Sequence, residues 1–421
     1  MFYKETNFKE TPIGKIPKDW EVVKLSDKAE VVSGFGFPLD YQGKRSGKYP
    51  FIKVNDLNLT QKYVLTADNF IDDEDLKALR AKVFPPNTII FPKIGMAIYL
   101  NKFRVLKTWG TFDNNIAGVI PKEINPEFLF YYFQGKIDLK QLSGRTTAPS
   151  IRKTTLELIL IPYPSLQEQQ KIAEILSTVD ETIQKANEII AKTERLKKGL
   201  MQELLTKGIG HKEFKDTEIG RIPKDWEIVK LGDVLELCQY GLSIPLKEKG
   251  KYPIVRMDEI VNGYITPNVA KYVDLDEETF EKFKLEKGDI LFNRTNAPDL
   301  VGRTGIFLLE GNYVFASYLI RLRVKREIFD PHFLTFYLIF SEERLKQLAT
   351  RAVHQANINA TNLKNLKIPR PAIEEQRKIV EILSTVDKKL EVERNEKAKL
   401  EKIKQGLMDL LLSGKIRVKV N

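Results

Sequence analysis

The chain has 421 residues, and its content of 42% hydrophobic and 10% aromatic residues is typical of a globular protein with room for two or three domains. This composition excludes a disordered chain, and the single cysteine, Cys238, excludes an internal disulfide framework. The formal net charge of +11 favours a polyanionic partner such as nucleic acid, although many basic proteins bind none.

Two features of the sequence bear on where the protein works. The longest apolar runs, at 128–133 and 333–340, are well short of the roughly 20 residues that a membrane-spanning helix needs. The amino terminus, MFYKETNFKE, is polar and lacks the apolar stretch of a secretory signal. We therefore expect a cytoplasmic protein, and the lone cysteine suits a reducing compartment.

The chain repeats itself. The stretch IGKIPKDWEVVKL at 13–25 returns as IGRIPKDWEIVKL at 219–231. The stretch IPYPSLQEQQKIAEILSTVD at 161–180 returns as IPRPAIEEQRKIVEILSTVD at 368–387. Repetition at a near-constant period indicates two copies of one unit of roughly 205 residues. In each copy, a strand-rich globular part precedes a long helix.

The globular parts have the pattern of an α+β fold. Short runs rich in Ile, Val and Phe enter polar loops, as strands do, and a longer apolar run after them is typical of a buried helix. The predicted strands are 87–93 and 114–120 in the first copy and 288–294 and 317–324 in the second, and the predicted helices are 126–134 and 331–340.

The loops after the matched strands differ between the copies. PKIGMAIYLNK follows Phe91, whereas NRTNAPDLVGRTG follows Phe292, and the segments after a shared LKQL also differ. These loops and segments are rich in the kinds of side chain that contact phosphates and base edges in DNA. The alternative interpretation is that they are exposed polar loops without a function. The candidate DNA-binding residues are Lys93, Asn101, Lys102, Arg104, Arg145, Thr146, Thr147, Arg152 and Lys153 in the first copy, and Asn293, Arg294, Thr295, Asn296, Arg303, Arg351, His354, Gln355, Asn357 and Asn359 in the second.

The long helices begin after the second repeated stretch. Ser165 and Glu168 form an S-x-x-E pattern that predicts a capping box, and apolar residues then recur at steps of three and four. Each helix has about 40 residues and is therefore on the order of 60 Å long. An apolar stripe of that length requires a partner, and the path of the chain makes the second helix run back antiparallel to the first.

These elements predict an α+β protein with two globular domains separated by two long antiparallel helices, a coiled-coil rod, with internal two-fold pseudo-symmetry. The expected boundaries are 1–160 and 211–367 for the globular domains, and 161–210 and 368–421 for the helices. Trp20 and Trp226 are interpreted as matched core anchors. Gly199 and Gly406 lie inside the helices, where close crossing of the two helices is the favoured explanation and a notch for a partner is the second.

In the order of its motifs, the chain resembles the DNA-specificity subunit of a type I restriction–modification system. The resemblance rests on IPKDWE-x-VKL at the start of each half, GDILF at 288–292, the EQ-x-KI-x-EILSTVD entry to each helix, and GLM-x-x-LL at 199–205 and 406–412. It covers essentially the whole chain. PNTIIF in the first half replaces GDILF, which leaves the start of the first loop less defined.

The resemblance implies a non-catalytic subunit that binds double-stranded DNA. Each globular part would be a target recognition domain that reads half of a bipartite, asymmetric site. The helices would act as a spacer and dock two modification subunits, and restriction subunits would then join. S-adenosylmethionine is expected on the modification subunits, and no cofactor is expected in this chain.

Catalytic alternatives find little support in the residues. No P-loop and no Asn-Pro-Pro-Tyr or Asp-Pro-Pro-Tyr motif occurs. SGFGFP at 33–38 is better explained as a turn with aromatic packing than as a glycine loop for a methyl-donor nucleotide. Pro298-Asp299 lacks the E-x-K of a nuclease and is better explained as a turn. The three histidines are scattered, so no metal site is expected. A structural tether with protein-binding heads is the remaining alternative to a DNA reader.

Overall fold

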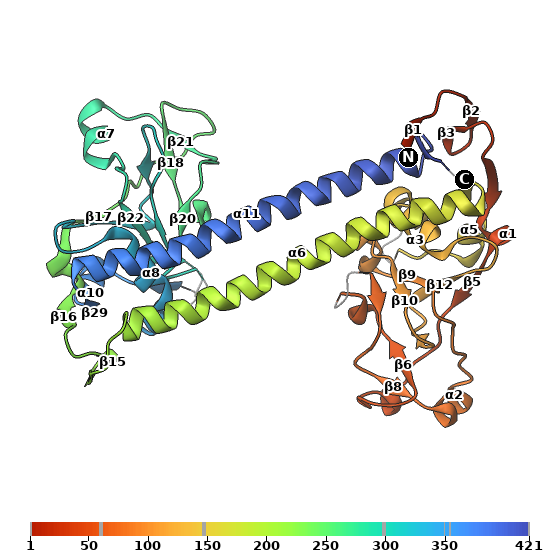
Figure 1. Ribbon diagram of the computed structural model, residues 1–421, viewed down its shortest axis with the longest axis horizontal. Helices are drawn as coiled ribbons and strands as arrows, with labels where there is room; N and C mark the ends of the chain where they lie inside the picture. The colour runs from red at the N-terminus through yellow and green to blue at the C-terminus, as the bar shows by residue number, and fades with distance from the viewer. Residues whose placement is uncertain are drawn as a thin grey trace. The chain divides into compact units, whose positions relative to one another are not determined.

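The computed structural model describes residues 2–58, 62–144, 149–296, 300–348, 350–352 and 355–419 (Figure 1). The chain divides into two compact units, one of Met1–Glu188 with Arg394–Asn421 and one of Ile189–Glu393. Each unit therefore contains one globular domain and a part of both long helices.

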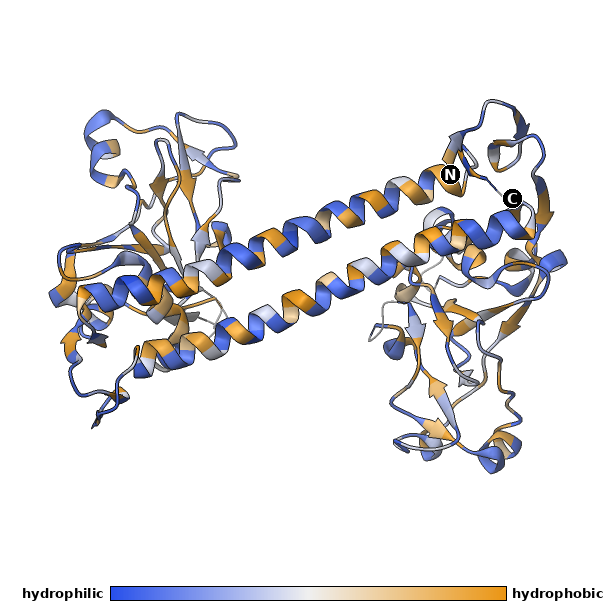
Figure 2. Ribbon diagram, in the orientation of Figure 1, coloured by the Kyte–Doolittle hydropathy of each residue, from blue (hydrophilic) through white to orange (hydrophobic). Residues whose placement is uncertain are grey.

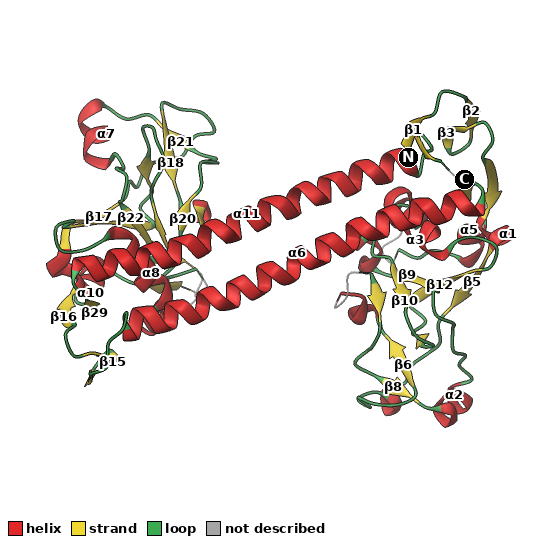
Figure 3. Cartoon of the chain, viewed as in Figure 1, coloured by secondary structure: helices red, strands yellow, loops and turns green. Residues whose placement is uncertain are grey.

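The first unit combines short strands with helices, as the sequence predicts (Figure 3). Its central sheet has the strand order β5-β12-β9-β10-β7, and a smaller sheet has the order β11-β6-β8. Two-stranded pairs are β1-β30, β2-β3 and β13-β4. The elements before the long helix are β1 (Phe2–Lys4), β2 (Phe8–Thr11), β3 (Gly14–Pro17), β4 (Glu21–Lys24), α1 (Leu25–Lys28), β5 (Ala29–Ser33), η1 (Leu39–Tyr41), β6 (Tyr49–Ile52), η2 (Val54–Asn58), β7 (Tyr63–Val64), β8 (Phe70–Ile71), α2 (Asp73–Leu79), β9 (Ile89–Pro92), η3 (Met96–Leu100), β10 (Arg104–Leu106), β11 (Thr111–Phe112), β12 (Ile116–Pro121), α3 (Pro126–Lys136), α4 (Leu139–Leu142), α5 (Lys153–Glu157) and β13 (Leu160–Tyr163), and β30 (Ile416–Val418) lies near the carboxyl end.

The second unit has a corresponding sheet with the strand order β17-β26-β22-β24-β20-β19. Beside it are a three-stranded sheet, β21-β18-β25, a second one, β23-β28-β27, and the pairs β14-β15 and β16-β29. Its elements are β14 (Phe214–Thr217), β15 (Gly220–Pro223), β16 (Glu227–Lys230), η4 (Leu231–Val234), β17 (Leu235–Tyr240), β18 (Tyr252–Val255), η5 (Met257–Glu259), β19 (Ile260–Val261), β20 (Tyr264–Ile265), β21 (Tyr272–Val273), α7 (Glu277–Phe283), β22 (Ile290–Asn293), β23 (Thr295–Asn296), β24 (Thr304–Ile306), β25 (Val314–Phe315), β26 (Leu319–Val324), α8 (Pro331–Phe340), α9 (Glu342–Leu348), β27 (Thr350–Ala352), β28 (Gln355–Asn357), α10 (Ala360–Lys364) and β29 (Lys367–Arg370).

The predicted strands and helices of the globular parts are confirmed as β9, β12, α3, β22, β26 and α8. In each domain the two matched strands are antiparallel neighbours in the sheet, so the loops that follow them leave from opposite ends. The apolar helix that comes next begins with proline and is capped by Asn125 in α3 and by Asp330 in α8.

The core of each domain lies between the sheet and this helix. Phe91 in β9 and Phe103 just before β10 are buried, and the ring of Phe133 from α3 meets both, with centroid distances of 6.0 and 5.5 Å. Burial of such aromatic side chains is the main stabilising term of a core of this kind. Trp20 and Trp226 are each 1% exposed, which confirms them as matched core anchors.

The long helices are α6 (Leu166–Lys207) and α11 (Ile373–Leu411), and each contributes a part to both units. Hydrophobic and polar residues alternate along both helices (Figure 2). In the first unit, Asp180 of α6 pairs with Lys404 of α11 at 2.7 Å. In the second unit, Lys197 of α6 pairs with Asp387 of α11 at 2.5 Å. Because the partner numbers fall along one helix as they rise along the other, the helices are antiparallel.

These ion pairs between the helices are largely shielded from solvent and are tied to the domains. The side chains of Lys197 and Asp387 are 16% and 13% exposed. The hydroxyl of Tyr264 in β20 donates to Asp387 at 3.1 Å, as the hydroxyl of Tyr131 in α3 donates to Asp180 at 2.8 Å. In each unit, the carboxylate of Asp180 or Asp387 therefore links its own helix to the other long helix and to the globular domain.

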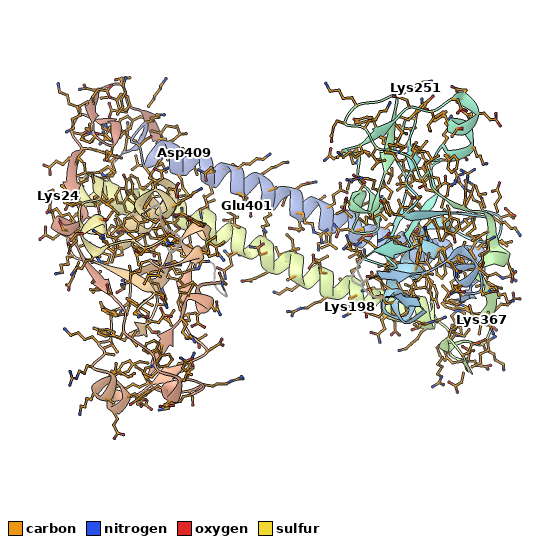
Figure 4. All side chains as sticks on the ribbon, turned by 180° about the vertical axis from the view of Figure 1, so that it is seen from behind. Lys24, Lys198, Lys251, Lys367, Glu401 and Asp409 are labelled. Carbon is orange, nitrogen blue, oxygen red and sulfur yellow. The ribbon has the colours of Figure 1, made fainter. Side chains whose placement is uncertain are left out.

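We expect Asp387→Ala to lower the free energy of unfolding of the second unit by about 2–3 kcal/mol, because Lys197 and Tyr264 lose their acceptor. Exchanging the charges with Lys197→Asp and Asp387→Lys restores the ion pair and recovers part of the loss. Asp409→Ala is the control, since Asp409 on α11 (Figure 4) is 55% exposed in its pair with Lys136. Urea unfolding of the full chain measures all three, and equal effects of Asp387→Ala and Asp409→Ala would contradict the expectation.

The start of α6 differs in part from the predicted capping box. The hydroxyl of Ser165 accepts from the N–H of Glu168 at 3.2 Å, as a cap does. The Glu168 carboxylate, however, accepts from Trp20 Nε1 at 3.0 Å and from the Arg417 guanidinium at 2.5 and 2.8 Å. The acid of the box thus serves tertiary contacts, because it is 1% exposed and its partners come from other segments.

The explanation of Gly199 and Gly406 by close helix crossing is wrong. A Cβ atom built at either position meets no atom within 4 Å. Both glycines therefore lie on an open face of their helix, and the second explanation, a notch for a partner, remains a prediction. Among the described residues, no helix is both long and apolar enough to cross a membrane.

Candidate nucleic-acid interface

In the second unit, the two variable loops come together. The segment after β22 forms β23, which pairs with β28 through Thr295 opposite Asn357 and Asn296 opposite Ala356. Strand β28 also pairs with β27, in which Arg351 lies opposite Ala356. Segments that are separate in the sequence therefore build one small sheet beside the end of β22.

The first unit brings the equivalent loops together by a shorter contact. Ile94 forms a bridge with Ser150, the N–H of Gly95 donates to Pro149 O at 2.8 Å, and the N–H of Ile151 donates to Lys93 O at 2.9 Å. The loop after β9 thus lies along the segment after α4. Both domains join the same two loops, and the side chains that these loops carry differ.

A basic residue occupies the same place in each domain, two positions after the matched phenylalanine. Lys93 Nζ donates to Ser33 Oγ at 2.9 Å, and partial burial lowers the pKa of Lys93. Arg294 Nε donates to Ser317 O at 3.0 Å, and its guanidinium lies 4.8 Å from the centre of the Tyr240 ring. Ser33 and Tyr240 end the equivalent strands β5 and β17.

The backbone around these two residues is also equivalent. The N–H of Lys93 donates to Asn115 O at 2.8 Å, and the N–H of Arg294 donates to Tyr318 O at 3.1 Å. Gly34 and Gly241 follow the strand ends, where an added Cβ would lie only 2.0 and 2.3 Å from the carbonyl oxygens of Asp113 and Ala316. This close backbone approach requires glycine at both positions.

The rest of SGFGFP packs as a turn with aromatic contacts. The Phe37 ring stacks on Phe51 with centroids 3.7 Å apart, and Phe35 stacks on Phe84 at 6.0 Å. The carboxyl of Asp113, beside this turn, is 7% exposed, and burial raises its pKa. The predicted turn with aromatic packing is therefore what the structure shows at this segment.

Three of the predicted contact residues have structural roles. Arg104 is 8% exposed in β10 and donates to Phe103 O at 2.7 Å, and burial lowers its pKa. Asn293 is fully buried and donates to Leu300 O at 2.7 Å. Asn101 donates to Ile137 O and accepts from Leu139 N–H, both at 2.9 Å. Their polar groups face the protein, so we no longer count them among the candidate readers of DNA.

Other predicted residues remain at the surface near the joined loops. Arg152 and Lys153 are exposed at the start of α5, and Lys153 pairs with Glu157 at 3.6 Å. Lys102 reaches Asn58 Oδ1 at 2.5 Å. Arg303 is half-buried, and exposed Asn359 caps α10 by accepting from Asn362 N–H at 2.7 Å. Their contact with DNA stays a prediction.

The remaining candidates fall into two groups. Arg145, Thr146, Thr147 and His354 lie outside the described residues. Thr295, Asn296, Arg351, Gln355 and Asn357 are placed as backbone in β23, β27 and β28. In the part of the chain that is described, no group of three or more His, Cys, Asp or Glu residues is arranged to hold a metal ion.

Four further residues belong to the site and were not predicted from the sequence: Ser33, Tyr240, Ser317 and Tyr318. Tyr240 and Tyr318 are 41% and 45% exposed beside Arg294, and the Tyr240 hydroxyl accepts from the N–H of Ala360 at 2.8 Å. A signal was present, because Ser33 and Tyr240 each precede a glycine at matched positions of the repeat.

Comparison with known proteins agrees with the internal repeat. A family model described as "Type I restriction modification DNA specificity domain" matches the chain twice, over residues 17–195 and 223–402. Each match covers one globular domain together with most of the helix that follows it in the sequence. The two matches therefore correspond to the two copies of the sequence repeat.

Two specificity subunits of type I restriction enzymes align with the whole chain. The chain is 32% identical to the putative type I restriction enzyme MjaX specificity subunit of Methanocaldococcus jannaschii, over 100% of this chain and 99% of that protein. It is 33% identical to the MjaVIII specificity subunit of the same organism, over 100% and 98%. The crystal structure of a type I restriction–modification S subunit from M. genitalium matches its fold with a TM-score of 0.60 at 16% identity, over 98% of this chain and 100% of that one.

Proposed function

Because the chain belongs to the family of type I restriction–modification DNA specificity proteins, we propose that each of its two domains reads one half of a bipartite, asymmetric DNA site. The observation that carries this proposal is the joining of two loops around Lys93 in one domain and Arg294 in the other. The frame of the site is repeated and its side chains are not, as expected when two half-sites differ in sequence.

The chain reads DNA and does not itself catalyse a reaction, and S-adenosylmethionine is bound by a separate modification subunit. We support this assignment by the absence of catalytic methyltransferase and P-loop motifs from the sequence. The purified chain is expected to transfer no methyl group to DNA, and methylation is expected once a modification subunit is added. Methyl transfer by the chain alone would overturn this part of the proposal.

The long helices dock two modification subunits, and restriction subunits then join this assembly. The complex acts inside the cell, where DNA is found. Leu196 is 56% exposed one turn before Gly199 in α6, and Ile403 is 52% exposed one turn before Gly406 in α11. Both glycines face open space. An exposed apolar side chain beside a glycine notch fits a partner helix, and the repeat provides the arrangement twice.

The half-site assignment is tested with alanine variants of the two matched basic residues. We expect Arg294→Ala to reduce discrimination at one position of the second half-site by about 1–3 kcal/mol, because an arginine can contact guanine through two hydrogen bonds. Lys93→Ala is expected to affect the first half-site alone. Binding of the chain with its modification subunits to DNA variants measures both effects.

The control for this test is Lys251→Ala. Lys251 (Figure 4) is an exposed cation of the second unit that pairs with Glu277 at 3.6 Å and lies outside the joined loops. It is expected to leave the preference for each base unchanged. If Arg294→Ala weakened both half-sites equally, the assignment of one half-site to each domain would be wrong. If the chain showed no salt-dependent binding to DNA, the alternative of a tether with protein-binding heads would be favoured.

A further inference from the structure

The loop after β9 in the first domain exposes a group of large apolar side chains. In η3, Met96 is 69% exposed and Leu100 is 57% exposed, and Ile94 and Tyr99 beside them are 39% and 44% exposed. We call these four residues the apolar tip. Exposed apolar residues scattered singly are ordinary, but four in seven consecutive positions form a patch that calls for a partner.

The apolar tip is held firmly by the domain. Ile98, in the middle of η3, is fully buried in the core of the unit. Asn101 ends η3 in a left-handed conformation (φ 48°), and its side chain bonds Ile137 O and Leu139 N–H, both at 2.9 Å. Met96 and Leu100 are therefore exposed by a fixed backbone, and binding through them costs little ordering of the chain.

The surroundings of the apolar tip are basic. Lys93 directly precedes it, Lys140 Nζ lies 5.6 Å from the centre of the Tyr99 ring, and Ile94 pairs with Ser150, which is close in sequence to exposed Arg152. An apolar patch among lysine and arginine residues fits a polyanion that also offers apolar groups. Duplex DNA is such a partner, since its phosphates flank the bases.

The second domain does not repeat this feature in its described residues. In the equivalent loop, Leu300 is half-buried and Val301 is fully buried. These two described apolar side chains pack against the protein, and the loop begins with the polar strand β23. The two domains thus present different chemistry to the same kind of partner.

We propose that the apolar tip reads thymine methyl groups in the major groove of the first half-site. This inference rests on the proposed function of the domain as a DNA reader. In an undistorted duplex, the C5-methyl group of thymine is the apolar group on the base edges of the major groove. Met96 and Leu100 cannot pair with the polar groups of other bases, so they favour thymine at the positions they touch.

The test uses the full chain with its modification subunits and DNA in which single thymines are replaced by deoxyuridine. This replacement removes one methyl group and leaves base pairing unchanged. We expect binding to weaken about fourfold for each contacted methyl group in the first half-site, as the burial of one such group predicts. The double variant Met96→Ala with Leu100→Ala is expected to bind roughly tenfold more weakly and to lose this sensitivity.

The matched control is Leu65→Ala, because Leu65 is 60% exposed, close to the 57% of Leu100, and follows β7 of the same domain outside the joined loops. It should keep the full response to deoxyuridine. The inference is overturned if the first half-site contains no thymine, if its deoxyuridine variants bind as well as thymine, or if the double variant retains the response. In each of these cases, the proposed function still stands if the unmodified chain prefers specific sequences at both half-sites. If the unmodified chain shows no sequence preference at all, the proposed function is refuted.

Discussion

A chain in which a second copy of residues 7–160 replaces residues 213–367 is expected to recognise two inverted copies of the first half-site. The replacement keeps α6, α11 and Arg417 and exchanges only the globular domain. If each domain reads its own half-site through the joined loops, the second specificity is lost completely. Sequencing of methylated DNA from cells that carry this chain and its partners measures the result.

The long helices provide equivalent seats for the transplanted domain. In the first unit, Met408 and Leu412 of the α11 end belong to the core, and in the second unit Met201 and Leu205 of α6 do so at the matched positions. Asp387 matches Asp180 in the repeat and loses its donor Tyr264 in the swap, so it is available for the hydroxyl of Tyr131 of the copy. The swap therefore replaces one set of contacts by its equivalent.

The reciprocal replacement is the control, and it is expected to give an inverted repeat of the second half-site. Circular dichroism and thermal unfolding check that both variant chains fold. A folded variant that kept the original asymmetric site would show that specificity does not belong to the globular domains one by one.

Much of the architecture could be predicted because the repeat tests each interpretation twice. A strand proposed at β9 had to have its equivalent at β22, and the helix at α3 had its equivalent at α8. The placement of the two variable loops at matching positions was also visible. Their direct pairing, through Gly95 with Pro149 and through β23 with β28, was not, because loop segments carry no periodic pattern that specifies a partner.

Single contact residues were harder to predict, for reasons that the structure makes clear. Strand β10 has only Arg104–Leu106, too short for an alternation of polar and apolar residues to reveal it, so Arg104 seemed to lie in a loop. Asn293 is the last residue of β22 and fully buried, although its amide is typical of an exposed position. Polar side chains in cores are decided by tertiary hydrogen bonds, which one sequence does not display.

The boundaries expected from the sequence set the helices apart as 161–210 and 368–421, and they stay a prediction. The compact units are defined by contacts, and each combines a globular domain with parts of both helices. The carboxyl-terminal strand β30 pairs with β1, with Tyr3 opposite Arg417. An antiparallel pairing between such distant segments follows from the course of the helices, and neither strand is long enough to be recognised by itself.

The same strand leads to a second large effect, expected for Arg417→Ala. The guanidinium of Arg417 donates to Glu168, to Glu5 at 2.7 Å and to Asp19 at 2.9 Å. Its removal leaves Glu168 buried with Trp20 Nε1 as a remaining donor. Breaking a buried ion pair in this way is expected to lower the free energy of unfolding of the first unit by about 3–5 kcal/mol.

Two further variants separate the ion pair from other effects. Lys415→Ala removes an exposed cation of the same segment and is expected to change stability by less than about 1 kcal/mol. Arg417→His is expected to recover part of the stability, because His211 holds the equivalent Glu375 in the second unit through Nε2 at 2.9 Å. Urea unfolding compares the variants, and equal midpoints for Arg417→Ala and Lys415→Ala would rule out the proposed role.

The effect of Arg417→Ala is also expected to depend on pH. Hydrogen bonds from Arg417 lower the pKa of Asp19 in the folded protein below its ordinary value of 3.8. The stabilisation from this carboxylate is therefore present above that ordinary value and is lost as pH falls through the lower folded value. Because the variant lacks it throughout, the difference in stability between the two proteins should narrow as pH falls below about 4. A difference that stays constant or widens between pH 5 and pH 2.5 would show that Asp19 does not contribute through Arg417.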